Sequence, residues 1–375
     1  MSRVDKLMVL YHNRLVGDMV LVNNRLAAFE YNKNWLIDGF PISPFSLPLV
    51  KRVFMPKYDP FEGLFGVFAD SLPDGWGRLL VDRLMRKKGI EPARVDVLTR
   101  LGIVGEAGMG ALSYKPTALV ENIEKNLSYD EIATECRKVL NDEMTDELDF
   151  LFVNGGASCG VRPKIMTFID DEPWLIKFPS TYDRENVGEM EYRYALCARL
   201  CGIQMSAVRL FPSNKCSGYF GTKRFDFRVG KKGLEKIHMV SAAGLLETSH
   251  RIPNLDYDIL MKLTLKLTRN MEECKKMFRL MCFNVFAHNR DDHSKNFTYI
   301  YSEDENRWAL SPAYDLTYSN SFGGEHATTV HGEGRKPGME NIMEVAKAIG
   351  LNTRWAKAEG EKIKEIVFTE LKDYL

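Results

Sequence analysis

The hydrophobic pattern of the chain changes along its length, and this change limits the folds that it can adopt. Up to about residue 50, short apolar runs at 7–11, 19–22 and 26–31 are separated by His12-Asn13 and Asn23-Asn24. Asn-rich turns between β-branched and aromatic segments are typical of a meander of β-strands. From residue 257 onward, long stretches carry apolar residues at helical spacing. Strands first and helices later predict an α+β fold.

A length of 375 residues is enough for two domains. We place the boundary near residues 117–127, so that residues 1–120 form a β-rich domain with helix, and Asp74 is expected to cap a helix there. In residues 121–375, strands continue to about residue 230 and helices follow. The elements predicted there are a helix at 128–140, strands at 150–153, 165–169 and 174–178, a helix at 187–200, a long helix at 257–286, a hairpin at 297–310, and helices at 338–349 and 353–371.

Charge and composition exclude several classes of protein. The 51 basic and 51 acidic side chains balance, which argues against a chain whose own surface is a dedicated nucleic-acid binder, although local basic patches remain open. No apolar run approaches the ~18 residues of a membrane span, and the polar start at 1–6 makes a signal peptide unexpected. The seven cysteines are scattered without a CxxC pair, so we expect reduced thiols in a cytoplasmic protein.

The most informative segment is the octapeptide 289–296, Asn-Arg-Asp-Asp-His-Ser-Lys-Asn. Its Arg290-Asp291 pair, followed five residues after the Asp by Asn296, matches the R-D-x-x-x-x-N core of a kinase catalytic loop. In that chemistry a carboxylate accepts the proton of the attacking hydroxyl, and an amide oxygen binds the metal that bridges the phosphates. Polar loops of similar composition also follow helices elsewhere, so this loop alone leaves both interpretations open.

Three further motifs fit the same reaction. Asp315 lies 19 residues after Asn296, a gap that fits a hairpin leading back to the same site, and it would be a second magnesium ligand there. The glycine-rich loop 155–164 would let backbone N–H groups approach phosphate oxygens. Lys177 in an apolar strand would pair with a glutamate of the next helix, which offers Glu189 and Glu191, and Glu191 is our candidate. Each motif has an ordinary alternative: a turn residue, a hairpin connection, or a lysine on an edge strand.

The order of these motifs along the chain favours phosphoryl transfer over other chemistry. Glycine-rich loop, lysine strand, glutamate helix, Asp-Asn loop and metal-binding Asp follow one another in a workable sequence. A zinc hydrolase is not indicated, because there is no HExxH and His288 and His293 have no third ligand candidate nearby. A serine hydrolase is not indicated either, because no G-x-S-x-G is present.

On these motifs the chain resembles the HipA family, the serine/threonine-kinase toxins of bacterial type II toxin–antitoxin modules. Residues 65–78, Phe-Gly-Val-Phe-Ala-Asp-Ser-Leu-Pro-Asp-Gly-Trp-Gly-Arg, are close to a signature of the family's accessory domain. The kinase motifs of the family are matched at 160–164, 224–226, 289–296 and 312–315. The resemblance covers nearly the whole chain. It implies a bilobal protein-kinase-like fold with a β-rich accessory domain and a mostly helical C-terminal lobe.

The resemblance also implies a role for each matching residue. Asp291 would be the catalytic base, Asn296 and Asp315 would hold Mg²⁺, and Ser158 would be autophosphorylated, which in the family moves the glycine-rich loop and silences the enzyme. The residues implied to bind ATP are Cys159, Gly160, Val161, Arg162, Pro163 and Lys164 of the phosphate loop, Lys177 on the phosphates, Lys223, Arg224 and Phe225 of the hinge beside adenine, and His293, Lys295, Asn296, Tyr314 and Asp315.

The partners implied are a small helix-turn-helix antitoxin of HipB type, DNA reached only through that antitoxin, and a protein substrate, which among known relatives includes an aminoacyl-tRNA synthetase. Two other functions remain open. One is a small-molecule kinase of the aminoglycoside or choline type, which uses a similar Asp…Asn loop. The other is an antitoxin-binding co-repressor that no longer turns over ATP. The intact set of Lys177, Asp291, Asn296 and Asp315 favours an active protein kinase that uses ATP and Mg²⁺.

Overall fold

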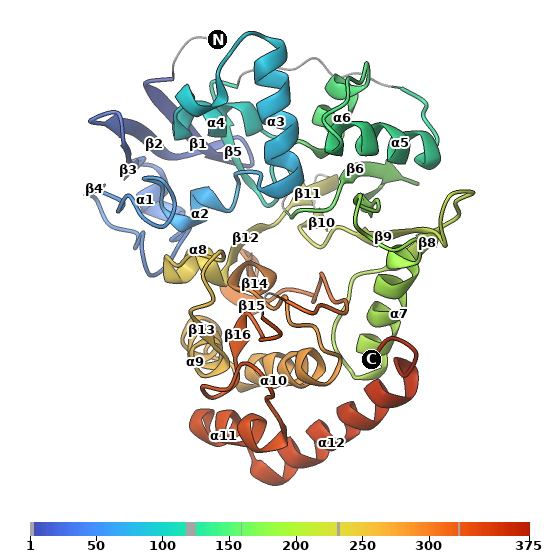
Figure 1. The fold of residues 1–375 in the computed structure, drawn as a ribbon. Helices are drawn as coiled ribbons and strands as arrows, with labels where there is room; N and C mark the ends of the chain where they lie inside the picture. The colour runs from blue at the N-terminus through green and yellow to red at the C-terminus, as the bar shows by residue number, and fades with distance from the viewer. Residues whose placement is uncertain (1–3, 118–124, 159, 231–232, 322) are drawn as a thin grey trace. The chain divides into compact units, whose positions relative to one another are not determined.

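The computed structural model describes residues 4–117, 125–158, 160–230, 233–321 and 323–375. The chain forms two compact units. Unit 1 comprises residues 1–188, 210–240 and 244–247, and unit 2 comprises residues 189–209, 241–243 and 248–375. Both units contain helices and strands (Figure 1), so the α+β class predicted from the sequence is confirmed.

Unit 1 begins with a five-stranded antiparallel sheet in the order β4-β3-β2-β1-β5. Its strands are β1 (Lys6–Tyr11), β2 (Arg14–Val22), β3 (Leu26–Tyr31), β4 (Val53–Phe54) and β5 (Leu112–Lys115). His12 and Asn13 have φ of 48° and 64°, the left-handed backbone that a two-residue hairpin requires. Tyr11 therefore pairs with Arg14 across the turn, and the predicted meander is confirmed.

The helices of unit 1 come next. They are α1 (Trp35–Asp38), α2 (Gly66–Ala69), α3 (Gly75–Lys87), η1 (Pro92–Arg94), α4 (Val97–Val104), α5 (Tyr129–Leu140) and α6 (Leu148–Gly155). Ser128 and Glu131 form a reciprocal capping box at the start of α5, as the sequence predicts. Asp74 precedes α3 as expected, but its side chain makes no capping hydrogen bond, so that part of the prediction is wrong.

Residues 150–153, predicted to be a strand, lie in helix α6. A short apolar run cannot be assigned to a strand or to a buried helix from its periodicity alone. Here Phe150, Leu151 and Phe152 are all buried in one core with Trp76 and Leu80 of α3. The glycine-rich loop therefore connects a helix to a strand, and not two strands as predicted.

The second sheet of unit 1 contains the strands predicted near 165–169 and 174–178. Strand β7 (Glu172–Lys177) lies between β6 (Lys164–Ile169) and β9 (Tyr219–Lys223), antiparallel to both. The remaining strands of this region are β8 (Val208–Phe211), β10 (Phe227–Gly230), β11 (Gly233–Lys236) and β12 (His238–Ser241). Because β7 is an interior strand, Lys177 at its end is not an edge-strand lysine.

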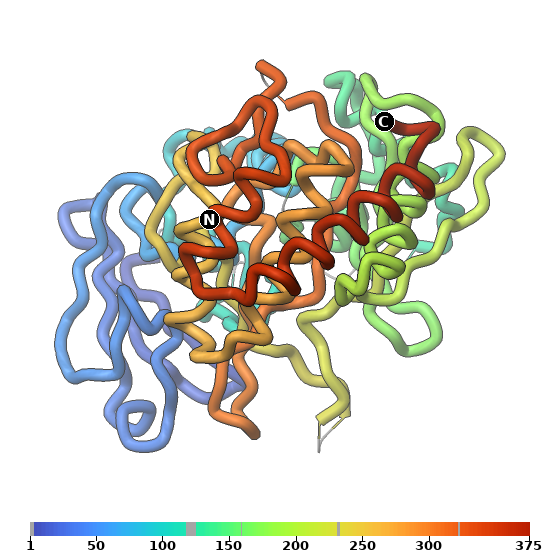
Figure 2. The backbone as a smooth tube through the Cα atoms, turned by 90° about the horizontal axis from the view of Figure 1, so that it is seen from below, coloured from blue at the N-terminus to red at the C-terminus, as the bar shows by residue number. Residues whose placement is uncertain are grey.

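Unit 2 is mostly helical. Its elements, some of which begin or end in unit 1, are α7 (Val187–Leu200), α8 (Ala242–Leu246), β13 (Leu255–Asp256), α9 (Tyr257–Thr268), α10 (Met271–Phe286), η2 (Ser294–Asn296), β14 (Thr298–Ser302), β15 (Arg307–Leu310), β16 (Thr328–Thr329), α11 (Met339–Ile349) and α12 (Thr353–Glu370). Helix α10 packs against α9, α11 and α12. Figure 2 shows α12 as one continuous helix that runs toward the C-terminus.

The single helix predicted over 257–286 is in fact two helices, α9 and α10. Arg269 adopts a left-handed backbone with φ of 53°, which ends α9. The Asn270 side chain then accepts a hydrogen bond from the Glu272 N–H at 3.0 Å and caps α10. Asn is a common helix N-cap and could indicate the break, but the apolar residues at helical spacing on both sides predict one continuous helix.

Among the residues described, no helix is both long and apolar enough to cross a bilayer. The six cysteines within the described ranges are free thiols, and Cys159 lies outside those ranges.

The buried ring of His238 predicts acid sensitivity of unit 1. Its Nε2 lies 2.7 Å from the Ile42 carbonyl oxygen, and burial lowers the pKa of the imidazole from 6.5 to about 4. Between these two pH values the His238 imidazole is protonated in the unfolded chain but stays neutral in the folded chain. Stability therefore falls by roughly 3 kcal/mol as the pH drops from about 6.5 to about 4, and this residue adds no pH dependence above that window.

Denaturant unfolding of wild type and His238→Gln at pH 7 and pH 4.5 measures this effect. The amide of Gln can still donate to Ile42 but does not titrate, so the variant should lose less stability on acidification than the wild type. An equal loss in both proteins would show that His238 is not the group responsible.

Candidate active site

The residues predicted to form the site divide between the two units. Unit 1 contains Ser158, Lys177, the phosphate loop 160–164 and the hinge 223–225, and unit 2 contains Glu191, Asp291, His293 and the other predicted residues. Cys159 lies outside the described residues.

The glycine-rich loop is bound to the start of α3. The Asp74 carboxylate accepts a hydrogen bond from the Gly160 N–H, and the Trp76 N–H donates to the Gly160 carbonyl at 3.0 Å. The buried Trp76 indole N–H donates to the Lys164 carbonyl at 3.2 Å. Gly75, with φ of 45°, allows this approach, because a Cβ there would lie 2.5 Å from the Gly160 oxygen. Residues 74–76 of the N-terminal signature thus position the predicted phosphate loop.

Ser158, the predicted autophosphorylation site, is fully buried in this arrangement. Its Oγ donates to the Gly155 carbonyl at 2.5 Å. A Cβ at Gly77 would lie 2.4 Å from the Ser158 carbonyl oxygen, so α3 packs directly on the serine. For the hydroxyl to receive a phosphate, this part of the loop would have to leave its position.

Two lysines lie opposite one another where the phosphate loop enters the sheet. Lys164 of β6 pairs in register with Lys177 of β7, so both side chains project from the same face. Lys164 is buried, and a Cβ on Gly160 would lie 2.5 Å from its Nζ. Lys177 is half-buried, with its Nζ 5.6 Å from the centre of the Phe220 ring. Two ammonium groups beside a glycine-rich loop could bind an anionic phosphate chain.

The predicted hinge is held by ion pairs. Lys223 contacts Glu172 at 2.6 Å, and the Arg224 guanidinium binds the buried Asp226 carboxylate through two hydrogen bonds of 2.9 and 2.7 Å. Burial alone would raise the pKa of Asp226, but the Arg224 charge and hydrogen bonds outweigh burial and lower that pKa below its usual value. The Arg224 side chain, through its ion pair with the buried Asp226, thus holds the backbone of the predicted hinge in place.

In unit 2 the predicted catalytic loop connects α10 to β14. Asp291 is exposed, as a base that meets a substrate hydroxyl must be. The Asn296 amide Nδ2 donates to the Asp291 carbonyl at 2.8 Å. This bond joins the predicted base to a predicted metal ligand and leaves the amide oxygen of Asn296 as the atom that could bind a cation.

Asp315 is brought to the same loop by its neighbour Tyr314. The Tyr314 hydroxyl lies 2.5 Å from the Lys295 carbonyl oxygen and 2.6 Å from the Thr298 hydroxyl. Asp315 itself has a left-handed backbone, with φ of 54°. A hydrogen bond therefore joins Tyr314 and Lys295, the residues next to the two predicted metal ligands.

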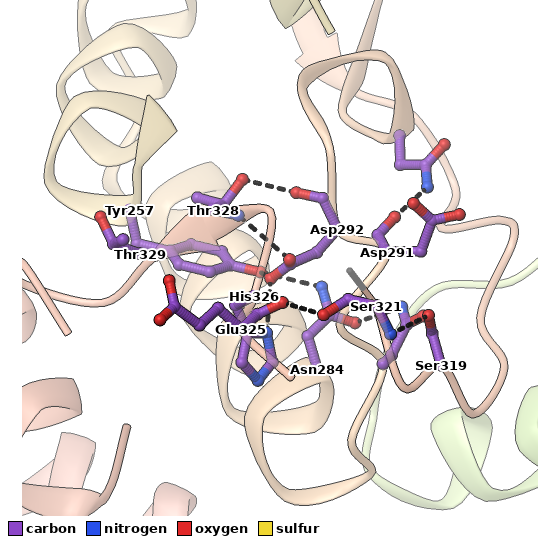
Figure 3. Close-up of polar contacts among 12 residues, drawn as sticks. Tyr257, Asn284, Asp291, Asp292, Ser319, Ser321, Glu325, His326, Thr328 and Thr329 are labelled. Atoms are coloured by element: carbon purple, nitrogen blue, oxygen red, sulfur yellow. Dashed lines mark hydrogen bonds and ion pairs between the residues drawn. The ribbon is translucent and has the colours of Figure 1, made fainter. Parts of the chain in front are cut away.

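Sequence reasoning missed Asp292, the residue that holds this loop in place (Figure 3). Its buried Oδ2 accepts hydrogen bonds from the Tyr257 hydroxyl at 2.9 Å and from His326 Nδ1 at 3.0 Å. Its Oδ1 accepts from the Thr328 N–H at 3.1 Å. Burial and the Asp292 charge raise the pKa of Tyr257 well above its usual value, so the phenol keeps the proton that it donates. The only sequence signal was a second Asp directly after Asp291.

Three other predicted residues lie as follows. Glu191 is buried in α7. The His293 ring is half-buried, 5.7 Å from that of His250. Arg162 of the phosphate loop makes two hydrogen bonds of 3.1 Å to Asp183. The pairing of Lys177 with Glu191 stays a prediction.

The donor set of unit 2 fits Mg²⁺. This ion prefers one or two carboxylates and completes its shell with phosphate oxygens and water. Asp315 offers a carboxylate and Asn296 an amide oxygen, both on the connected loops described above. Within the described ranges no three His, Cys, Asp or Glu side chains gather as a site for a more demanding metal. These two residues could therefore hold Mg²⁺ together with a bound nucleotide.

The fold and this loop define an α+β protein with a kinase-type Asp…Asn loop, and comparison with known proteins gives the family. The HipA-like C-terminal domain matches residues 156–370, and the HipA N-terminal domain matches residues 7–115. The chain belongs to the HipA family, and the resemblance proposed from its motifs is confirmed. A search of curated proteins found no match.

Two solved structures align with the chain, and the first of them shares its fold. The HipA of Shewanella oneidensis MR-1, from a toxin–antitoxin complex with HipB and operator DNA, aligns with a TM-score of 0.72 and 16% identity, over 98% of this chain and 90% of that one. The proinflammatory kinase CtkA of Helicobacter pylori aligns with a TM-score of 0.38 and 11% identity, over 56% of this chain and 90% of that one.

The bond between Trp76 and the phosphate loop can be tested with a matched pair of tryptophans. Trp76→Phe removes the indole donor to the Lys164 carbonyl, and Trp35→Phe removes an equally buried donor to the Phe40 carbonyl. Each substitution should lower stability by about 1–3 kcal/mol. Only Trp76→Phe should also raise amide hydrogen exchange within residues 160–164. Equal exchange of this loop in both variants would contradict a specific role for Trp76.

Proposed function

We propose that the protein is a serine/threonine-protein kinase toxin of a HipA-like toxin–antitoxin module. The observation that carries the proposal is the loop of unit 2, where the exposed Asp291 is hydrogen-bonded through its carbonyl to Asn296 and where Tyr314 ties Asp315 to the same loop. Membership of the HipA family and the fold shared with a HipA protein support it.

In the proposed reaction, the hydroxyl oxygen of a protein substrate attacks the γ-phosphorus of ATP. The bond between that phosphorus and the β–γ bridging oxygen breaks, ADP leaves, and the carboxylate of Asp291 takes the hydroxyl proton. Mg²⁺, when bound to Asn296 and Asp315, would neutralise charge on the phosphates. The anchored ends of the catalytic loop would keep Asp291 in place during the transfer.

Unit 1 would contribute nucleotide binding. Backbone N–H groups of 160–164 would face phosphate oxygens, and Lys177, with Glu191 as its partner, would hold the phosphates. We assign the segment 223–225 to contacts with adenine, and His293, Lys295 and Tyr314 to further contacts with the nucleotide. We assign residues 1–120 to an accessory domain and residues 121–375 to the kinase domain.

We further propose a small helix-turn-helix antitoxin of HipB type as the partner, with DNA reached through it, and a cytoplasmic location. The support is the relative from Shewanella oneidensis, whose structure contains HipB and operator DNA. Phosphorylation of Ser158 would regulate the kinase by requiring the buried serine to leave its contacts with Gly155 and Gly77.

The intact mass of the purified protein after incubation with Mg-ATP tests the proposed activity. The wild type should gain phosphate, and Asp291→Asn, which keeps the shape of the side chain but not its basicity, should slow this gain by on the order of 10²–10⁴-fold. Phosphorylation at the same rate in wild type and Asp291→Asn would contradict the role of Asp291.

Ser158→Ala separates the activity from its regulation. No added phosphate on this variant, together with retained phosphorylation of an exogenous protein, would place the modification on Ser158. Phosphate on the variant would move the modified residue elsewhere and leave the kinase proposal intact. No transfer by the wild type to itself or to any protein, with the antitoxin still bound, would favour the co-repressor, and phosphate found only on a metabolite would favour the small-molecule kinase.

A further inference from the structure

The segment 326–332, here called the return segment, lies downstream of Asp315 and is tied to the rest of unit 2 at nearly every residue. Thr328 and Thr329 form β16, which pairs in parallel with β13. The Thr329 hydroxyl and the Gly332 N–H both donate to the Asp256 carboxylate, at 2.5 and 2.8 Å. These contacts hold the outer side of the segment against the start of α9.

On its inner side, the return segment is hydrogen-bonded to Asp292. His326 Nδ1 and the Thr328 N–H donate to its two carboxylate oxygens, and the Thr328 hydroxyl donates to its carbonyl at 2.5 Å (Figure 3). Between them, the Ala327 N–H donates to the Arg290 carbonyl at 3.0 Å. Three consecutive residues of the return segment thus bond to the two residues that flank Asp291.

The same carboxylate is fixed from the opposite side by α9 and α10. The Tyr257 hydroxyl that donates to Asp292 also accepts from Asn284 Nδ2 at 2.9 Å, and the Asn284 amide oxygen accepts from Asn289 Nδ2 at 2.9 Å. Asn289 and Asp292 lie on either side of Arg290-Asp291. A closed chain of buried hydrogen bonds therefore anchors both ends of the loop that carries the proposed base.

We propose that Asp292 is a positioning residue for phosphoryl transfer, whose buried carboxylate orders the return segment against the catalytic loop. In many protein kinases the segment that follows the metal-binding Asp is ordered by an added phosphate paired with arginine. Here a carboxylate of the chain itself fulfils that function, so the segment is ordered without phosphorylation. The inference deepens the proposed function and rests on it for its catalytic part only.

Thr328 offers a matched pair of variants. Thr328→Val keeps the shape of this fully buried side chain and removes the hydroxyl that donates to the Asp292 carbonyl, whereas Thr328→Ser keeps the hydroxyl. Thr328→Val should raise amide exchange at Ala327 and Thr328 by on the order of tenfold, because a buried acceptor loses its donor. It should lower kcat by on the order of tenfold with the KM for ATP changed by less than about twofold. Thr328→Ser should restore both values toward the wild type.

Two controls distinguish positioning from a general loss of structure. His331→Gln alters an exposed contact of the same segment with Asp258 and should leave exchange and kcat unchanged. Amides of α10 should stay protected in every variant, and Asp292→Asn should reproduce the effect of Thr328→Val. Removal of any phosphate from the wild type with a phosphatase should not lower kcat.

Exchange and kcat at wild-type level in Thr328→Val, no recovery in Thr328→Ser, or loss of kcat on phosphatase treatment would each overturn the inference. If the wild type transfers no phosphate, the proposed function fails on its own, and the exchange measurements still decide whether Asp292 orders the return segment.

Discussion

A buried carboxylate without a matching set of donors is strongly unfavourable, and this constraint organises unit 2. Asp292 satisfies it with three donors from two separate parts of the chain, Tyr257 of α9 and the pair His326 and Thr328. The carboxylate can be buried only while these parts are together. Asp291 is exposed and directly precedes Asp292 in the chain, so the contacts that bury Asp292 also hold the backbone at Asp291 in place.

A second constraint operates in unit 1. Glycine has no side chain, so the backbone N–H and carbonyl groups of a glycine-rich loop need hydrogen-bond partners from other parts of the chain. Asp74 and Trp76 supply a carboxylate acceptor, a backbone donor and an indole donor to Gly160 and Lys164. A loop held in this way presents its remaining N–H groups in a defined direction, which is what binding of a phosphate chain requires. Hydrogen bonds thus join residues 74–76 and the glycine-rich loop into one structural element.

Local patterns were sufficient to predict much of the fold. The Asn-rich turns, the Ser128–Glu131 capping box and the strand that carries Lys177 depend on neighbours in sequence, and each was found. The apolar run at 150–153 predicts a strand, because the run itself does not show which element it packs against. In the folded chain it packs against α3 and forms part of helix α6. The break between α9 and α10 was missed because the apolar spacing continues through it.

The sequence carries a pattern for only one short segment of the candidate site. The spacing from Asp291 to Asn296 identified the loop, and the structure brings the neighbours of Asn296 and Asp315 together. The bonds that fix these loops join residues far apart in sequence: 86 positions for Asp74 and Gly160, and 34 for Asp292 and His326. No local pattern reports such a pairing, so the supporting residues were visible only in the folded chain.

The central claim, that Asp291, Asn296 and Asp315 form a phosphoryl-transfer site, is tested most directly by a crystal structure of Asp291→Asn with ATP and Mg²⁺. The account predicts a cation at about 2.1 Å from the Asn296 amide oxygen and from the Asp315 carboxylate, with the γ-phosphate beside residue 291. A cation bound by other residues, or a nucleotide whose γ-phosphate lies away from residue 291, would contradict it.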